Sequence, residues 1–219
     1  DQYNQLIGAK NSNGDSYQYE YDSIGNRLKA VENGKTREFS YNKLNQISND
    51  GYAYDAWGNM IKTPEAEYKY DLKNRLIEVK KKDGIVVKYE YDPMAQRIAS
   101  NVNDKDNTAF LMSSMIEYAR RNSDNPQYHT LGLDLLGTLE QTGAVGSILA
   151  TNNIQYLYDG HGNVIAATLN GVIIDRLAYE PFGKQTLGSN LPFTFSSKPV
   201  DQSEMSYYGY RFYNKTINL

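Results

Sequence analysis

The chain has 219 residues, with 26 acidic against 23 basic side chains, a formal net charge of −3 and no cysteine. The missing cysteine excludes disulfides and thiolate metal sites. The Lys and Arg residues are dispersed and form no basic groove for nucleic acid. No run of about 18 apolar residues predicts a membrane-spanning helix. Tyrosine is abundant, at 20 against 6 Phe and 1 Trp, and this polar-tipped aromatic suits a sheet with one wet face.

A short pattern recurs along most of the chain, and its clearest copy is 156–165. Tyr156 and Tyr158 lie two residues apart, so on a strand they project from the same face. Asp159 opens a turn because its carboxylate can accept bonds from the backbone N–H groups ahead of it. Gly162 suits the last turn position, where positive φ carries little steric cost. The pattern therefore predicts a β-hairpin.

The copies follow one another at variable distances. The second tyrosine falls at 21, 41, 54, 70 and 91, which gives steps of 20, 13, 16 and 21. Each repeat holds two short strands and must stack on its neighbours to bury an apolar face. Residues 1–7 read as the back half of one more copy, so we expect the chain to be a piece of a longer polypeptide. The full copies are 19–28, 39–47, 52–61, 68–77, 89–98 and 156–165, with a weaker one at 177–184.

The repeat signature predicts structural residues at the same place in each hairpin. The aspartates have two interpretations: a ladder of carboxylates that binds a cation or ligand, or caps that each stabilise their own turn. The second is favoured because Asn42 and Glu180 replace Asp in two copies. The signature residues are Tyr21, Asp22, Gly25, Tyr54, Asp55, Gly58, Tyr70, Asp71, Tyr91, Asp92, Tyr158, Asp159, Gly162, Tyr179 and Gly183.

The opposite hairpin ends carry a different turn signal. Asn-Gly or Asp-Gly pairs occur at 13–14, 33–34, 50–51, 83–84 and 170–171, and such pairs are typical of tight hairpin turns. The basic run Lys80-Lys81-Lys82 comes just before one of them and is expected to be a solvated turn.

Residues 99–128 fit the repeat pattern poorly. The segment 109–119 has apolar residues at helical spacing, with Asp106, Asn107 and Thr108 available as caps. The alternative is two short strands around Ser113-Ser114. Because repeats lie on both sides, we favour the strands.

Few residues are candidates for catalysis or metal binding. His129 and His161 are the only histidines, and neither has the neighbours of a recognisable metal site. His161 occupies a turn position where an exposed side chain is expected. Asp104 and Asp106 lack the glycine and distal Glu of a calcium loop. No cofactor or metal site is predicted.

These repeats resemble the YD repeat of bacterial RHS proteins, which also occurs in toxin-complex components, wall-associated proteins and animal teneurins. The stretches 131–150, 178–183, 192–198 and 207–213 resemble the RHS repeat-associated core. The resemblance implies an all-β fold of antiparallel hairpins wound into a long curved sheet, part of a shell or cocoon. It divides 1–219 into YD repeats (1–98), an irregular connecting region (99–153) and a core segment (154–219).

The resemblance also implies a structural, non-catalytic part of a shell that encloses a C-terminal toxin, secreted or on the cell surface of a bacterium. Expected partners are the remainder of the parent chain or copies of this chain, and an enclosed toxin polypeptide, without nucleic acid or a membrane-spanning segment. Two alternatives remain: an adhesive module that binds glycans or a partner protein through exposed Tyr and Trp57, and a self-cleaving core whose aspartates lie beyond Leu219.

The end of the sequence bears on the self-cleaving alternative. Self-cleaving RHS cores carry aspartates in a DPxG-like context after the Tyr-rich segment. Here Asn214 and Lys215 replace the usual pair, and 213–219 contains no such motif. Asp201 and Glu204 match acidic positions before the Tyr-rich segment and are expected in a surface turn. We therefore expect no enzymatic activity from this chain. Because a repeat array cut at both ends exposes an unpaired strand edge, we also expect the chain to associate through its two ends.

Overall fold

The computed structural model describes residues 1–122, 125–189 and 191–217, and regular structure there is strand apart from one short 3-10 helix, η1 (Phe195–Ser197). The expected all-β class of antiparallel hairpins is confirmed. In this part of the chain no helix is long and apolar enough to cross a membrane. Asn218 and Leu219 lie outside the described residues. The chain divides into two compact units, 1–65 and 66–219, and each is described by itself.

The first unit contains a four-stranded antiparallel sheet in the order β1-β2-β3-β4, followed by the hairpin β5–β6. Between these lies a shorter hairpin, held by a bridge between Tyr41 and Ile47. Tyr17 and Tyr19 on β2 are buried while Gln18 and Glu20 between them are exposed, as expected for a sheet with one wet face. The strands are β1 (Gly8–Lys10), β2 (Ser16–Tyr21), β3 (Arg27–Glu32), β4 (Lys35–Glu38), β5 (Ala53–Tyr54) and β6 (Met60–Lys62).

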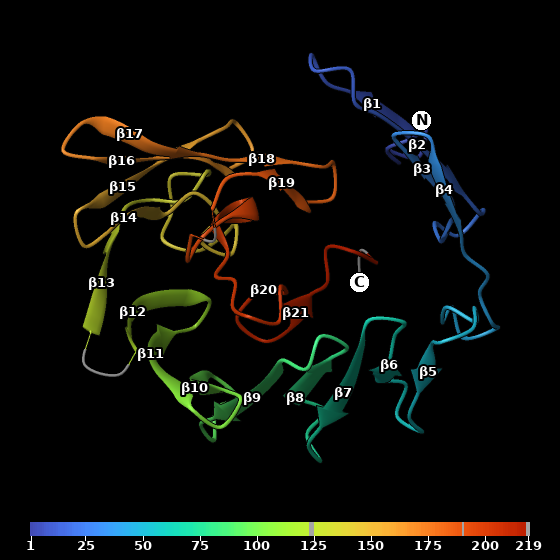
Figure 1. The fold of residues 1–219 in the computed structure, drawn as a ribbon, viewed down its shortest axis with the longest axis horizontal. Coiled ribbons are helices and arrows are strands. Elements are labelled where there is room, and N and C mark those ends of the chain that lie inside the picture. The colour runs from blue at the N-terminus through green and yellow to red at the C-terminus, as the bar shows by residue number, and fades with distance from the viewer. Residues whose placement is uncertain (123–124, 190, 218–219) are drawn as a thin grey trace. The chain divides into compact units, whose positions relative to one another are not determined.

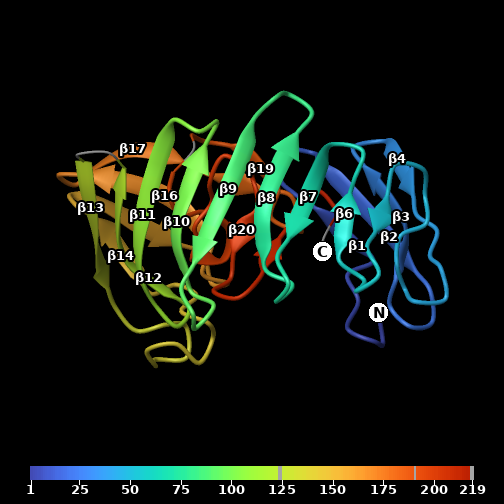
Figure 2. The same ribbon diagram turned by 90° about the horizontal axis from the view of Figure 1, so that it is seen from below.

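The second unit is built on one continuous sheet in which β7 to β17 are neighbours in sequence order (Figures 1 and 2). In Figure 1 these strands follow an arc, and β20 and β21 lie on its inner side. The pairs β18–β19 and β20–β21 form separate small sheets. The strands are β7 (Ala66–Tyr70), β8 (Leu76–Lys81), β9 (Val86–Tyr91), β10 (Arg97–Val102), β11 (Asp106–Ser113), β12 (Ile116–Asn122), β13 (Asn125–Leu131), β14 (Ile148–Thr151), β15 (Ile154–Tyr158), β16 (Val164–Leu169), β17 (Val172–Arg176), β18 (Ala178–Tyr179), β19 (Gln185–Leu187), β20 (Ser206–Tyr207) and β21 (Phe212–Tyr213).

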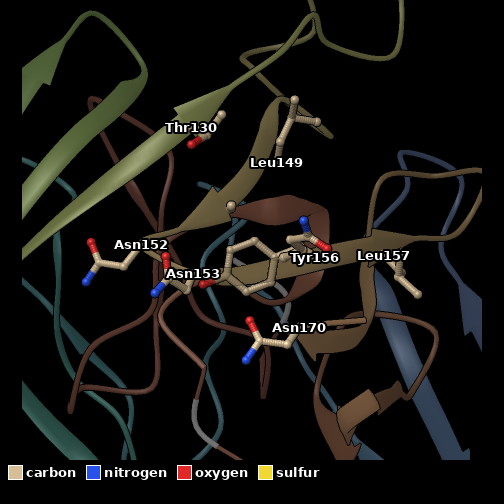
Figure 3. Close-up of a pocket in the computed structure, with 9 residues that line it drawn as sticks. Thr130, Leu149, Asn152, Asn153, Tyr156, Leu157 and Asn170 are labelled. Carbon is tan, nitrogen blue, oxygen red and sulfur yellow. The ribbon is translucent and has the colours of Figure 1, made fainter. Parts of the chain in front are cut away.

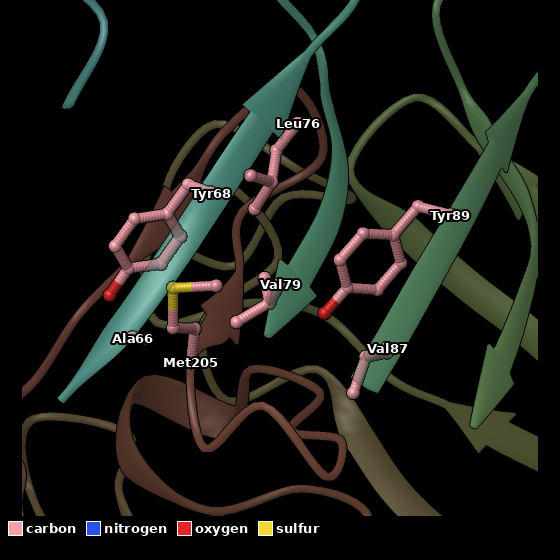
Figure 4. Packing of buried hydrophobic residues seen from close by; sticks show 7 residues of the cluster. All are labelled: Ala66, Tyr68, Leu76, Val79, Val87, Tyr89 and Met205. Carbon is pink, nitrogen blue, oxygen red and sulfur yellow. The ribbon is translucent and has the colours of Figure 1, made fainter. Parts of the chain in front are cut away.

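The C-terminal segment packs against the inner face of this sheet. Met205, just before β20, lies in one apolar cluster with residues of β7, β8 and β9 (Figure 4). Phe193 packs in a second cluster, with residues of β14, β15 and β16. The second unit therefore buries its own inner face in part, using residues far along the chain. The first cluster comprises Ala66, Tyr68, Leu76, Val79, Val87, Tyr89 and Met205.

Residues 109–119 form strands and not a helix. β11 and β12 pair on either side of a turn at Ser114, as the favoured interpretation predicted. Phe110 faces inward and Leu111 is 63% exposed, so the apolar run alternates across the sheet. Pairing with β10 and β13 on the two outer sides decides the outcome. Most of the stretch 99–131 is regular strand, and the irregular part is 132–147.

Candidate functional site

Each repeat places a hydrogen-bonded turn at the same edge of the sheet. In the first unit, Oδ1 of Asp22 accepts bonds from the backbone N–H groups of Ile24 at 3.0 Å and Asn26 at 2.8 Å. The side-chain amide of Asn26 donates to Oδ2 of the same Asp22 at 2.8 Å. The bond from the Asn59 amide, the largest effect, lowers the pKa of Asp55 in the equivalent turn. Asp159 and Asn163 repeat the arrangement in the second unit.

The turn carboxylates act on their own turns. Asp71 accepts bonds from the backbone and guanidinium of Arg75, and Asp92 accepts one from the backbone of Gln96 at 2.8 Å. Among the described residues, no three acidic or histidine side chains are placed to hold a metal ion. The geometry is that of caps, and it offers no carboxylate ladder for a cation.

The turn glycines have the backbone geometry that the pattern predicts. Gly25 and Gly58 have φ of 94° and 87°, a region open to glycine at little cost. Gly183 has a second reason to be glycine: a Cβ there would lie 2.5 Å from the ring of Phe195. At Asn74 and Ala95 other residues adopt the same left-handed conformation, with φ of 58° and 67°.

The second tyrosine of the repeat joins it to the repeat before. The Tyr21 hydroxyl donates to the Leu6 carbonyl at 3.0 Å, and the Tyr41 hydroxyl to the Arg27 carbonyl at 3.1 Å. Each accepting residue lies five positions after the Asp of the preceding turn. The same bond appears in the second unit from Tyr91 to Leu76 at 2.6 Å and from Tyr179 to Val164 at 2.7 Å.

Two signature tyrosines vary this link. The Tyr158 hydroxyl donates to the carbonyl of Ile148, in a different register. The Tyr54 hydroxyl instead accepts a bond from the N–H of Ile47, at 3.0 Å. Tyr70 packs against the apolar cluster of Figure 4. The tyrosine hydroxyls are therefore mainly connectors between successive repeats.

A buried ionic cluster lies where the C-terminal segment meets the sheet of the second unit. The Arg97 side chain is 2% exposed, and its guanidinium lies 4.1 Å from the Phe110 ring centre and 4.2 Å from that of Tyr207. It pairs with Asp201 at 3.1 Å and lies 3.7 Å from Glu117. The Tyr89 hydroxyl donates to Asp201 at 3.1 Å. The cluster ties the turn at 201–204 to β9 and β10.

Glu117 extends the cluster to a buried histidine. Burial alone would raise the pKa of Glu117, but Arg120, the His129 hydrogen bond and Arg97 lower that pKa to about 2. His129 Nε2 lies 3.2 Å from Glu117 Oε1, and its Nδ1 lies 2.9 Å from Thr151 Oγ1. The Tyr156 hydroxyl donates to the same Thr151 oxygen at 2.9 Å.

The Thr151–His129–Glu117 arrangement has the order of a nucleophile, a base and an orienting acid, but its environment is closed. The His129 side chain is 0% exposed and Thr151 is 4% exposed. Catalysis on an external substrate needs space near the reacting oxygen, and Tyr156 is bonded to that oxygen here. We interpret the arrangement as a buried structural network that fixes β12, β13 and β14, in which Glu117 Oε2 faces Arg97 at 3.7 Å without a hydrogen bond.

The buried cluster corrects one expectation and adds residues that the pattern had not singled out. Glu204 is in a surface turn as expected, with its side chain 78% exposed. For Asp201 that expectation is wrong, because its side chain is 15% exposed and is held by Arg97. Asp134 forms another turn of the repeat type, with bonds from Leu136 and Thr138. In the sequence this turn is marked only by Asp134 and by the Gly three positions later, because no tyrosine stands directly before Asp134.

One pocket lies at the turns of β14–β15 and β16–β17 (Figure 3). It has a volume of about 620 Å³, and none of its lining residues is acidic, basic or histidine. Tyr156 is 5% exposed and its hydroxyl is engaged, so it offers no open ring for stacking a sugar. The lining residues are Thr130, Leu149, Ala150, Asn152, Asn153, Gln155, Tyr156, Leu157 and Asn170.

Comparison with known families agrees with these repeats. The teneurin YD-shell family matches residues 1–197. The chain belongs to that family. Curated relatives of this YD-shell chain include the tRNA3(Ser)-specific nuclease WapA of Bacillus spizizenii, 28% identical, and the tRNA nuclease WapA of Bacillus subtilis, 27% identical. Both matches cover 97% of this chain and 9% of the relative's length.

Solved structures show the same fold. A TcdB2-TccC3-TEV crystal structure covers 98% of this YD-shell chain and 16% of its own chain, with 14% identity and a TM-score of 0.52. A TcdB2-TccC3 structure has the same coverage and TM-score, with 15% identity. At these identities the likeness concerns the fold alone.

Proposed function

We propose that residues 1–219 form part of the wall of a YD-repeat shell that encloses a toxin polypeptide, in a bacterial protein that is secreted or displayed at the cell surface. The observation that carries this proposal is the tyrosine link between repeats. Because four repeats bond to the one before at the same position, the array can be continued strand by strand.

The buried cluster supports the proposed wall because it holds a segment of the chain against one face of the sheet, the inner face. The C-terminal segment covers part of the inner face of the second unit and is held there by Arg97 and Asp201. The nuclease activity in the names of the WapA relatives belongs to proteins of which this chain matches 9%. We propose that the chain itself has no catalytic role, in keeping with the closed surroundings of His129 and Thr151.

The test uses the gene product that contains residues 1–219. Limited proteolysis of the intact protein should leave an enclosed polypeptide undigested while exposed loops are cut. The double substitution Tyr91→Phe and Tyr179→Phe removes two links between repeats and should make that polypeptide digestible at a lower protease concentration.

Tyr118→Phe provides the matched control, since Tyr118 is 41% exposed on β12. It should leave the protection unchanged. If the wild-type protein contains no protected polypeptide, or if protection is the same in the double variant, the enclosing role is wrong and the chain serves another purpose.

A further inference from the structure

The repeat turns of the first unit carry one large apolar side chain each, at the same turn position. Tyr3, Ile24, Leu44 and Trp57 each lie two residues after the Asp or Asn that opens the turn. Their exposed fractions are 72%, 68%, 76% and 81%. We call these four residues the tip row. The middle of a surface turn ordinarily takes polar residues, so four apolar ones in succession need a reason.

The four turns are neighbours in space. The side-chain amide of Asn26 lies 3.4 Å from that of Asn45, which joins the second turn to the third. The Gln5 amide lies 3.6 Å from the position of a Cβ on Gly25, and the Gln46 amide lies 3.6 Å from that on Gly58. The first turn therefore contacts the second, and the third contacts the fourth. The tip row is a continuous feature of one edge.

The backbone of the tip row is fixed before any partner binds. The N–H of each tip residue donates to the carboxylate or amide oxygen that opens its turn, at 2.9 Å for Tyr3, 3.0 Å for Ile24, 2.8 Å for Leu44 and 2.9 Å for Trp57. These bonds hold the side chains outward. A preorganised surface loses less entropy on binding, and Trp and Tyr are the side chains that most often anchor interfaces.

The opposite edge of the same unit has a different character. Its turns contain Asn11 to Asp15, Asn33-Gly34 and Asn49 to Gly51, and no large apolar side chain is exposed among them. Chance exposure of apolar residues would affect both edges alike. The asymmetry indicates that the tip-row edge is a contact surface.

Turns of the same type are covered elsewhere in this fold. In the second unit, the Asp159 turn is contacted by Ser196 and Ser197, which bond to Asn163 at 2.8 Å and to the Gly162 carbonyl at 2.9 Å. The Glu180 turn is contacted by Tyr213, whose hydroxyl donates to the Phe182 carbonyl at 3.0 Å. Both covers are peptide segments of the chain itself. Such turns are therefore suited to receive YD-shell polypeptide.

We propose that the tip row is a docking surface for the tip row of a second copy of this chain. Each turn carries its apolar residue at the same position, so a second row related by a two-fold axis presents the same side chains in the reverse order. Of the residues at the middle positions of the four turns only Lys43 is charged, and the carboxylates of Asp1, Asp22 and Asp55 that open three of the turns are bonded to the backbone of their own turns. This inference goes beyond the wall function and does not depend on an enclosed polypeptide.

The exposed apolar area of the tip row sets the expected affinity of the dimer. Four such side chains expose on the order of 500 Å², near the upper limit for an apolar patch on a monomer. Two rows together would bury about 1,000 Å², at the lower limit for a specific interface. We therefore expect a dimer with a dissociation constant in the micromolar range, about 1–100 μM.

The first experiment uses Trp57, the only tryptophan of the chain, as the reporter. Sedimentation velocity and tryptophan emission are recorded from about 1 μM to about 1 mM, a range that spans the expected dissociation constant. The dimer should form as concentration rises, with a blue shift of the emission and weaker quenching by acrylamide. The double substitution Ile24→Ser and Leu44→Ser should weaken dimerisation at least about tenfold, while Leu111→Ser, at a 63% exposed strand position, should not.

The second experiment does not rely on a destabilising change. Because the chain has no cysteine, Leu44→Cys introduces a single thiol at the tip row, and mild oxidation should give a disulfide-linked dimer. Leu111→Cys should give little. A monomer at every concentration, a dimer in which Trp57 stays exposed, or equal cross-linking at both positions would each overturn the proposal.

Discussion

Arg97 and Asp201 form an ion pair at 3.1 Å although 104 residues separate them in the sequence. Arg97 begins β10, and Asp201 opens the turn that precedes β20. Since Arg97 is also enclosed by the rings of Phe110 and Tyr207, the pair is largely removed from water. Together with the apolar contacts of Met205, it links the C-terminal segment to the sheet.

Replacing Asp201 by Asn should lower the free energy of unfolding by about 2–4 kcal/mol, because it leaves the charge of Arg97 buried and less well compensated. Glu204→Gln is the control from the same turn. Glu204 is 78% exposed and pairs with Lys81, so its loss should change stability by less than about 0.5 kcal/mol. Urea unfolding of the two variants makes the comparison, and equal stabilities would show that the ion pair contributes little.

Tyr91→Phe should destabilise the second unit by about 1–2 kcal/mol, because the Leu76 carbonyl loses its hydroxyl donor. The ring remains, so apolar packing is preserved. Tyr118→Phe should have almost no effect. Hydrogen exchange should also speed up at β8 and β9 in the Tyr91 variant, the strands that this bond joins. Unchanged exchange there would mean that the link is dispensable.

Gly84 and Gly183 allow the energetic cost of a left-handed backbone to be measured separately from the cost of steric crowding around an added Cβ. Gly84 has φ of 90° with no atom within 4 Å of an added Cβ, whereas Gly183 has φ of 88° with the Phe195 ring at 2.5 Å. Gly84→Ala should therefore cost about 1–2 kcal/mol from the left-handed conformation, and Gly183→Ala about 1–3 kcal/mol more from overpacking. Thermal melts of both variants test the difference, and similar melting temperatures would argue against the close packing of Gly183.

Stability of the second unit should rise with pH between about 8 and 9. Burial lowers the pKa of Lys198 to about 8, whereas an unfolded lysine titrates near its ordinary value of 10.5. In that interval the unfolded state binds more protons, so raising the pH favours the folded state, by about 1 kcal/mol for one such group. Burial lowers the pKa of Lys215 to about 8 as well.

The measurement is urea unfolding at pH 8, about 8.5 and about 9, one unit below the ordinary tyrosine pKa of about 10. Lys198→Met should remove about half of the rise, since Lys215 remains. Lys73→Met, at an exposed turn position, should preserve it. A wild-type stability that is flat or falls over this interval would contradict the prediction.

The local turns could be predicted from the sequence because every group involved lies within five residues. Asp22, Gly25 and Asn26 contain the whole turn, so the spacing of residue types was sufficient. The sequence indicated only that the tyrosines suit a sheet with one wet face, and the acceptor of Tyr91 was not predictable because it lies in another repeat. The Arg97–Asp201 pair had no local signal, because it depends on where the C-terminal segment returns to the sheet.

The choice between helix and strand at 109–119 shows the same limit. Helical spacing of apolar residues was present, and the decision came from pairing with β10 and β13. His129 likewise shows no pattern that predicts burial, because Glu117 and Thr151 reach it from neighbouring strands. Contacts with other strands therefore determined the conformation of 109–119 and the burial of His129, which the local sequence did not decide.

The position of the tyrosine link also separates fixed from variable lengths in the repeat. In four of the links the acceptor lies five residues after the Asp, and the unequal steps of 20, 13, 16 and 21 are taken up by strand length and by the turns at the opposite hairpin ends. Foreign peptides inserted at the Asn33-Gly34 or Asp83-Gly84 turns should therefore be tolerated without a change in strand register. The fold can serve as a scaffold that displays long loops along one edge while the spacing between repeats at the other edge is unchanged.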